Sequence, residues 1–220
     1  MTLYVVATPI GNLKDISERA KTTLASVHTV LCEDTRVTRK LLDAYEIKIN
    51  VLSYHQHSGA PKISQVIGLL EQGHDIALVT DAGTPSISDP GGQLVETLVA
   101  TFGDRLRVVP IPGPSAVIAA LSVSGVSADR FTFLGFPPNK KGRQIFFDRL
   151  AEIETTIVFY ESTHRILKTL VEIDKRFPNR RLVVCRELTK LHETIYRGTP
   201  SEVTKHLESS SIKGEFVIVM

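Results

Sequence analysis

The chain carries a loop dense in glycine and proline directly after an apolar run. Residues 76–79 (IALV) are typical of a buried strand, and residues 80–92 read TDAGTPSISDPGG. Proline fixes φ and removes a backbone donor, whereas glycine lets another group approach the backbone without meeting a Cβ. The sequence therefore predicts a rigid turn beyond the carboxyl end of a strand, which is where open α/β sheets bind their ligands.

A second loop of the same kind follows the next predicted strand. It reads PGPSA at residues 112–116, after the apolar run at residues 106–109. A single Gly/Pro loop is about as often an ordinary strand-to-helix turn as a binding element. Two rigid loops at successive strand ends favour a binding pocket.

Apolar runs typical of strands alternate with helical patterns along the first half of the chain. The predicted strands there are residues 3–7, 29–32, 51–54, 76–79 and 106–109. This alternation predicts parallel strands joined by crossover helices. Further strands are predicted at residues 131–134, 156–160, 182–185, 193–197 and 216–219, and residues 193–197 alternate like a half-buried antiparallel strand. We expect an α/β fold with two α/β domains, residues 1–112 and 113–220.

Two segments carry the capping-box pattern of a helix start. Asp15 and Glu18 have the required spacing and predict a helix from Asp15 to about Ser26. Thr199 and Glu202 repeat the pattern, with Pro200 at the first helical position.

Composition excludes several classes of protein. The 220 residues are 42% hydrophobic and 23% charged, which is typical of a soluble globular protein, and no apolar stretch approaches the ~20 residues of a membrane helix. The start lacks the basic region of a signal peptide, and two distant cysteines suggest buried thiols, so we expect a cytoplasmic protein. His55 and His57 lie on opposite sides of an extended segment, and we expect no metal site.

Familiar nucleotide-binding and hydrolase motifs are absent from the sequence. The first turn, residues 7–12, reads ATPIGN where a dinucleotide fold would carry G-x-G-x-x-G. The chain also lacks a G-x-S-x-G elbow and an H-E-x-x-H zinc helix. The net charge of +2 permits a nucleic-acid partner without requiring one.

Polar clusters follow three of the predicted strands. They are EDTR at residues 33–36, ESTHR at residues 161–165 and RELTKLHE at residues 186–193. Charged runs are usually solvated faces, but a position directly after a strand indicates the ligand-binding edge of the sheet. Phosphate contacts are expected among the basic side chains Arg36, Arg39, Lys40, Lys140, Lys141, Arg143 and Lys190.

Five ordered motifs together carry a resemblance that covers nearly the whole chain. They are TPIGNL at residues 8–13, EDTR at 33–36, DAGTPSISDPG at 81–91, PGPSA at 112–116 and RELTK at 186–190. In this combination the chain resembles the tetrapyrrole-methylase-like (class III) methyltransferases. Within them it is similar to the branch that methylates the cytidine 2′-hydroxyl of bacterial small-subunit (16S) ribosomal RNA.

The resemblance implies a fold, a cofactor and an assembly. It implies two α/β domains of the tetrapyrrole-methylase type with S-adenosylmethionine (SAM) in the cleft between them, and a homodimer. The implied cofactor contacts are Pro9, Asp81, Ala82, Gly83, Thr84, Ile87, Ser115, Ala116, Tyr160 and Leu188. Corrin-type relatives carry a glycine-rich first turn, whereas ATPIGN here favours the RNA branch. RNA-modifying relatives also often continue beyond the position of Met220.

The expected reaction is transfer of the SAM methyl group to a ribose 2′-hydroxyl of ribosomal RNA or the 30S subunit. The candidate bases are Asp34, Glu187 and Lys190, the last only with a lowered pKa. The candidate substrate contacts are Arg36, Arg39, Lys140, Arg143 and Arg165. Two alternatives stay open: SAM-dependent methylation of a tetrapyrrole precursor, and a non-catalytic module that binds RNA or the ribosome.

Overall fold

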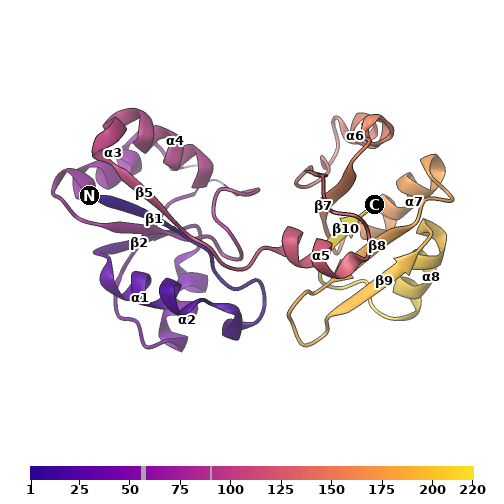
Figure 1. The fold of residues 1–220 in the computed structure, drawn as a ribbon, viewed down its shortest axis with the longest axis horizontal. Coiled ribbons are helices and arrows are strands. Elements are labelled where there is room, and N and C mark those ends of the chain that lie inside the picture. Colours follow the sequence, from indigo (N-terminus) through magenta and orange to yellow (C-terminus); the bar gives the residue numbers. More distant parts are fainter. Residues whose placement is uncertain (56–57, 90) are drawn as a thin grey trace. The chain divides into compact units, whose positions relative to one another are not determined.

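The computed structural model describes residues 1–55, 58–89 and 91–220, so His57 lies outside the described residues. The chain divides into two compact units, Met1–Ser115 and Ala116–Met220, called here the first and second unit. Each unit contains one five-stranded sheet covered by helices (Figure 1).

The first unit is built on a parallel sheet. Its strands are β1 (Thr2–Val6), β2 (Thr29–Cys32), β3 (Asn50–Ser53), β4 (Ile76–Leu78) and β5 (Arg107–Ile111), in the order β3-β2-β4-β1-β5. All neighbouring strands pair in parallel, which confirms the prediction from the alternating pattern. The carboxyl ends of the five strands therefore meet at one edge of the sheet.

Helices cover both faces of this sheet. They are α1 (Glu18–Ser26), α2 (Thr35–Ala44), α3 (Ala60–Glu71) and α4 (Gly91–Phe102), with short 3₁₀ turns at Leu13–Asp15 and Gly103–Arg105. Leu70 of α3 and Leu98 of α4 pack with Leu3 and Leu31 on one face. Leu24 of α1 and Leu42 of α2 belong to the core of the other face (Figure 1). Apolar burial on both faces explains why the strands read as continuous apolar runs.

The second unit has a mixed sheet in the order β6-β7-β10-β8-β9. Its strands are β6 (Phe131–Phe133), β7 (Thr156–Ser162), β8 (Leu182–Arg186), β9 (Thr194–Gly198) and β10 (Glu215–Val219). β10 is antiparallel to both β7 and β8, so β7 and β8 run in the same direction. The polar segments that follow β7 and β8 therefore lie at one edge. β9 pairs antiparallel with β8, as its alternation predicts.

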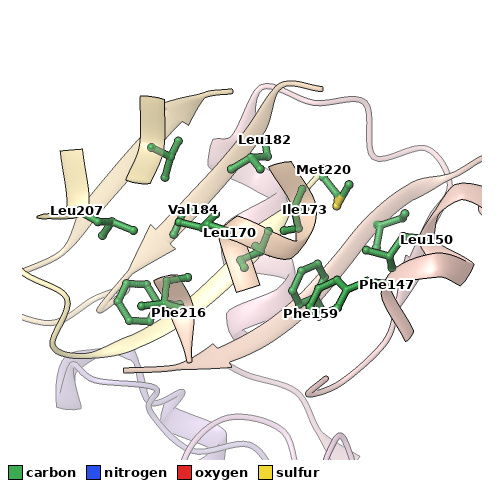
Figure 2. Close-up of a cluster of buried hydrophobic side chains, with 14 residues drawn as sticks. Phe147, Leu150, Phe159, Leu170, Ile173, Leu182, Val184, Leu207, Phe216 and Met220 are labelled. Atoms are coloured by element: carbon green, nitrogen blue, oxygen red, sulfur yellow. The ribbon is translucent and has the colours of Figure 1, made fainter. Parts of the chain in front are cut away.

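The core of the second unit lies between this sheet and its helices. The helices are α5 (Ala116–Ser124), α6 (Arg143–Arg149), α7 (Ile166–Arg176) and α8 (Pro200–Ser209), with a 3₁₀ turn at Leu150–Glu152. Phe159 of β7 is fully buried with Phe147 of α6 and Leu170 of α7 (Figure 2). Burial of each such side chain contributes roughly 1.5–3 kcal/mol.

One predicted helix start is wrong and the other is confirmed. Ser17, not Asp15, caps α1, because the Ser17 hydroxyl accepts a hydrogen bond from Ala20 N, and Asp15 lies in the preceding 3₁₀ turn. At α8, Glu202 Oε2 accepts from Thr199 N at 2.8 Å and Thr199 Oγ1 caps the Glu202 amide, so this capping box forms.

Both cysteines, Cys32 and Cys185, are buried and free, which confirms the expectation of buried thiols. Within the part of the chain that the structure describes, we find no helix with the length and hydrophobicity needed to cross a bilayer.

Candidate active site

Three loops of the first unit are tied together where β1, β4 and β5 end. Thr8, after β1, pairs with Gly83: Thr8 N donates to Gly83 O (2.9 Å) and Gly83 N donates to Thr8 O (3.1 Å). Thr84 Oγ1 donates to the carbonyl of Pro114, 3.2 Å away, in the loop after β5. The glycine- and proline-rich loops thus form one connected rim at the carboxyl edge of the sheet.

Two glycines in this rim are required by close packing. Gly83 has a φ of +84°, and a Cβ there would lie 3.3 Å from Ile10 Cγ2. A Cβ on Gly113 would lie 3.0 Å from the Cβ of Ala7. Larger residues would push the loops apart, so glycine keeps the rim narrow and exposes its backbone groups.

The loop after β4 holds two serines in strained conformations. Ser86 and Ser88 have φ values of +73° and +60°, which residues other than glycine seldom adopt. Asp89 Oδ1 fixes the turn by accepting from Ser86 N (2.9 Å) and Gly91 N (2.7 Å). Ser86 Oγ is buried and has no hydrogen-bond partner among the described residues. Strain and an unpaired polar atom together are typical of a ligand-binding loop.

A cavity of about 500 Å³ opens at the carboxyl ends of β2, β3 and β4. Its lining residues are Glu33, Asp34, Thr35, Arg36, Ser53, His55 and Asp81. Asp34 caps α2 by accepting from Arg36 N (2.8 Å), and its own amide donates to Asp81 Oδ1 (3.2 Å). The Arg36 guanidinium lies 2.6 Å from Asp34 Oδ2. The cavity is therefore acidic, with its one arginine paired to one of its three carboxylates.

The three carboxyl groups of this cavity differ in pKa. Partial desolvation in the cavity raises the pKa of Glu33, and the charges of Asp81 and Asp89 raise it further. Partial desolvation likewise raises the pKa of Asp81, whose side chain is exposed at the mouth of the cavity. Hydrogen bonds from Arg36 lower the pKa of Asp34 to about 2. Since a proton acceptor works best when its pKa is near the working pH, Glu33 and Asp81 suit that role better than Asp34.

The second unit has its own polar edge, at the ends of β7 and β8. Lys190 Nζ lies 2.8 Å from Glu187 Oε1 and 2.8 Å from Glu215 Oε2. Glu187 and Thr189 have φ values of +53° and +65°, and Thr189 Oγ1 is buried without a hydrogen-bond partner among the described residues. Leu188 is buried between them. Like the loop after β4, this loop has residues with positive φ values and a buried hydroxyl that lacks a partner among the described residues.

The ion pairs of this edge hold Glu187 and Lys190 in their charged forms. Burial alone would raise the pKa of Glu187, but hydrogen bonds with Lys190 and the Glu215 backbone outweigh it and lower the pKa. Burial alone would lower the pKa of Lys190, but its bonds to Glu187 and Glu215 raise the pKa. The lowered pKa that would make Lys190 a base is therefore not found.

Residues 2–204 match the family model described as Tetrapyrrole (Corrin/Porphyrin) Methylases. This match covers most of the chain. The chain belongs to the tetrapyrrole methylase family. The resemblance noted in the sequence is confirmed.

Several relatives of this tetrapyrrole methylase are named ribosomal RNA small subunit methyltransferase I. The chain is 45% identical to the one from Synechocystis sp., with 99% of this chain and 78% of the relative covered. It is 42% identical to the one from Halalkalibacterium halodurans, with 100% and 75% covered. It is 41% identical to the one from Thermotoga maritima, with 99% and 97% covered.

Solved structures of tetrapyrrole methylases share the fold. A cobalt precorrin-4 methyltransferase superposes with a TM-score of 0.71 at 18% identity, covering 99% of this chain and 93% of that chain. Uroporphyrin-III-C-methyltransferase from Thermus thermophilus gives a TM-score of 0.65 at 16% identity, with the same coverage. The predicted fold class, two α/β domains of the tetrapyrrole-methylase type, is confirmed.

The predicted cofactor contacts of this tetrapyrrole methylase fall in both units. The first unit contains Pro9, Asp81, Ala82, Gly83, Thr84, Ile87 and Ser115, and the second contains Ala116, Tyr160 and Leu188. In the first unit, the bonds of Thr8 to Gly83 and of Thr84 to Pro114 bring the three predicted segments together. Burial raises the pKa of Tyr160 on β7. Their contact with a cofactor stays a prediction.

The predicted bases and substrate contacts are also divided between the units. Asp34, Arg36 and Arg39 lie at the start of α2, where both arginine side chains are exposed. Lys140 is exposed in the loop before α6. Arg143 and Arg165 have side chains only 14% and 19% exposed, and both face Glu161. Contact of these residues with a substrate stays a prediction.

The sequence did not predict the roles that several residues of these edges have in the structure. Ser53 and His55 line the acidic cavity because β3 ends beside β2. Glu215 completes the pair with Lys190, and Glu161 is buried in the second unit. For Glu161 a signal was present, since an acid within the apolar run of β7 requires a buried partner.

Proposed function

We propose that this chain methylates the 2′-hydroxyl of a cytidine in small-subunit ribosomal RNA, with SAM as methyl donor. The observation that carries the proposal is 41–45% identity over nearly the whole chain to relatives named ribosomal RNA small subunit methyltransferase I. The tetrapyrrole methylases with solved structures are only 16–18% identical, which supports a shared fold and not a shared substrate. A tetrapyrrole substrate and a non-catalytic module are therefore not favoured.

The rim of the first unit fits a cofactor held largely through backbone groups. Gly83 and Gly113 leave room where a Cβ would fill it, and Ser86 Oγ, in the same loop as Gly83, is a buried hydroxyl with no hydrogen-bond partner among the described residues. We propose that Pro9, residues 81–87 and Ser115 hold SAM in this way, with Ala116, Tyr160 and Leu188 contributing from the second unit. When bound, SAM supplies an electrophilic methyl group to the acceptor oxygen.

The acceptor hydroxyl must lose a proton as its oxygen takes the methyl group. A positioned base contributes about 10²–10⁴-fold to such a step. Among the proposed bases, Asp34 has a pKa of about 2 and is a poor acceptor, while Glu187 and Lys190 are held charged by each other. Glu33 and Asp81, whose pKa values are raised, are the better candidates, and we extend the proposal to them.

The acidic cavity suits a nucleotide acceptor. Its volume of about 500 Å³ falls within the range of small-molecule sites. Carboxylates accept hydrogen bonds from the exocyclic amine of cytosine, so Glu33 or Asp81 can also recognise this base. Arg36 and Arg39 on α2 carry the positive charge that flanking phosphates require.

The experiment is methyl transfer from radiolabelled SAM to three acceptors: assembled 30S subunits, naked small-subunit ribosomal RNA and a corrinoid precursor. We expect label in RNA, at a cytidine whose 3′ phosphodiester bond resists alkaline cleavage because its 2′-oxygen carries the methyl group. Label in the corrinoid alone would overturn the proposal. SAM binding without transfer to any acceptor would favour the non-catalytic module. Light scattering of the same preparation tests the homodimer that the family resemblance implies.

A further inference from the structure

We propose that the loop between β6 and α6, residues 134–142, is a preformed contact for single-stranded RNA. In it Phe136 stacks on a base, Lys140 and Lys141 contact phosphates, and Glu161 positions the loop through Arg143 and Arg165. This inference rests on the proposed function, because it assigns a surface for the RNA substrate. It differs from the sequence prediction, which assigned Arg143 and Arg165 themselves to the substrate.

The loop begins with a sharp turn at the end of β6. Leu134 N donates to Val158 O (2.9 Å) and Tyr160 N donates to Gly135 O (2.8 Å), so pairing with β7 continues to Gly135. Gly135 has a φ of +64°, and the chain leaves the sheet at that point. The loop ends at Gly142, which has a φ of +83° and precedes α6. Both ends of the loop are therefore fixed by the fold.

A buried carboxylate holds the arginines that brace the loop. The side chain of Glu161 is 0% exposed; Arg165 Nε lies 2.8 Å from its Oε1 in an ion pair, and its Oε2 accepts from the Thr169 hydroxyl. Arg143 Nη2 lies 3.6 Å from Glu161 Oε2 and donates to Thr169 Oγ1 at 2.6 Å. One carboxylate thus fixes two guanidinium groups.

The same two arginines bind the loop backbone. Arg165 Nη1 donates to Pro137 O (2.8 Å) and to Asn139 Oδ1 (2.5 Å), and Arg143 Nη1 donates to Pro138 O (3.2 Å). Apart from those to the loop, their hydrogen bonds go to Thr169 and Ser162, and both guanidinium groups lie within 4 Å of the Glu161 carboxylate. We therefore assign Arg143 and Arg165 as positioning residues, with Glu161 holding both.

The bracing leaves an aromatic ring and two cations exposed. Phe136 is 51% exposed although it is a large apolar side chain; the Arg165 guanidinium lies 5.9 Å from its ring centroid, and the Tyr160 ring lies 5.2 Å away. Lys140 and Lys141 are exposed and form no ion pair with any residue that the structure describes. We see no folding role for a supported aromatic face in the same loop as two exposed lysines that have no ion pair among the described residues.

Single-stranded RNA matches this combination of groups. Unstacked bases bind on aromatic faces, and each such stack contributes about 1–3 kcal/mol, while lysines bind the phosphates between them. A duplex would hide its bases from Phe136. A pre-positioned loop also loses less conformational freedom on binding than a mobile one.

The test compares charge-matched double variants in binding to naked small-subunit ribosomal RNA across a salt series. Lys140→Ala with Lys141→Ala removes the proposed phosphate contacts. Lys168→Ala with Lys205→Ala removes two exposed lysines elsewhere in the second unit and is the control. We expect the first pair to lower the slope of log affinity against log salt by about 1.4, since each single-strand phosphate contributes about 0.7. The control should retain the wild-type slope.

A second pair of variants tests the aromatic contact. Phe136→Ala should weaken RNA binding by about tenfold. Ile145→Ala removes an apolar side chain of similar exposure, 57%, on the neighbouring helix and should leave affinity unchanged. SAM affinity and thermal unfolding are measured on every variant, so that a general folding defect is recognised.

Two kinds of failure are distinguishable. If the wild type methylates RNA and both loop variants bind RNA like their controls, this inference is overturned and the proposed function stands. If the folded wild type binds SAM but neither binds nor methylates RNA, the proposed function fails, and this inference fails with it.

Discussion

Glu161 and Arg165 form an ion pair inside the second unit, with Arg165 Nε 2.8 Å from Glu161 Oε1. The carboxylate is fully buried, whereas the arginine side chain keeps 19% of its surface exposed. Arg143 and Thr169 also contact the carboxylate, so removing its charge leaves two mostly buried guanidinium groups without their counter-ion. We therefore expect the charge of Glu161 to contribute to the stability of the second unit.

Glu161→Gln should destabilise the second unit. Removing one partner of a buried ion pair usually costs about 3–5 kcal/mol, and we expect about 2–3 kcal/mol because both arginines remain partly exposed. Urea unfolding followed by circular dichroism measures the change, and trypsin should cut faster at Lys140 and Lys141. Glu208→Gln, on the exposed face of α8, is the control and should change stability by less than about 0.5 kcal/mol. Equal stability of the two variants would contradict the assigned role.

Gly83→Ala should weaken SAM binding by at least about tenfold. Its φ of +84° strains any L side chain, and the new Cβ would press on Ile10, widening the rim. Gly73→Ala is a matched control, because Gly73 has a φ of +82° with open space around it. Calorimetric titration with SAM measures both affinities. Equal SAM affinity in the two variants would show that the rim does not hold the cofactor.

Glu33→Gln should flatten the acid limb of the pH dependence of kcat/KM for methyl transfer. The pKa of Glu33 is raised in the folded protein. As the pH falls through this pKa, the Glu33 carboxylate becomes protonated and can no longer accept a proton, which lowers kcat/KM in the wild type. Asp34→Asn should keep the acid limb and move it to lower pH, because the ionised Asp34 carboxylate is one of the charges that raise the pKa of Glu33. Loss of the limb in Asp34→Asn, with the limb kept in Glu33→Gln, would return Asp34 to the role of base.

Asp81→Asn should stabilise the protein above neutral pH, by roughly a few tenths of a kcal/mol given the exposure of the side chain. The pKa of Asp81 is raised in the folded state, so its charged form opposes folding at high pH, and this effect disappears as pH falls through the folded pKa. The urea midpoint of Asp81→Asn should therefore lie above that of the wild type at pH 8, and the two midpoints should approach each other at pH 4.5. Asp104→Asn, in the exposed turn after α4, is the control. Destabilisation by Asp81→Asn at pH 8 would contradict the inference that the charged form of Asp81 opposes folding.

Local sequence determined the parts of the protein that depend on neighbouring residues. Glycine and proline act on their own backbone, so a turn after the strand that ends at Leu78 was predicted from composition. Apolar periodicity predicted the parallel sheet of the first unit, and the Thr199–Glu202 spacing predicted a helix start that forms. The ordered motifs were enough to identify the family.

Tertiary structure decided which charges meet. Glu161 becomes a buried anchor only because α6 and α7 pack over the end of β7 and bring Arg143 and Arg165 to the same carboxylate. The pKa values of Glu33 and Asp81 are raised because strand ends distant in sequence converge on one cavity. Electrostatic energies depend on distance and burial in space, and neither quantity is encoded in the spacing of residues along the chain.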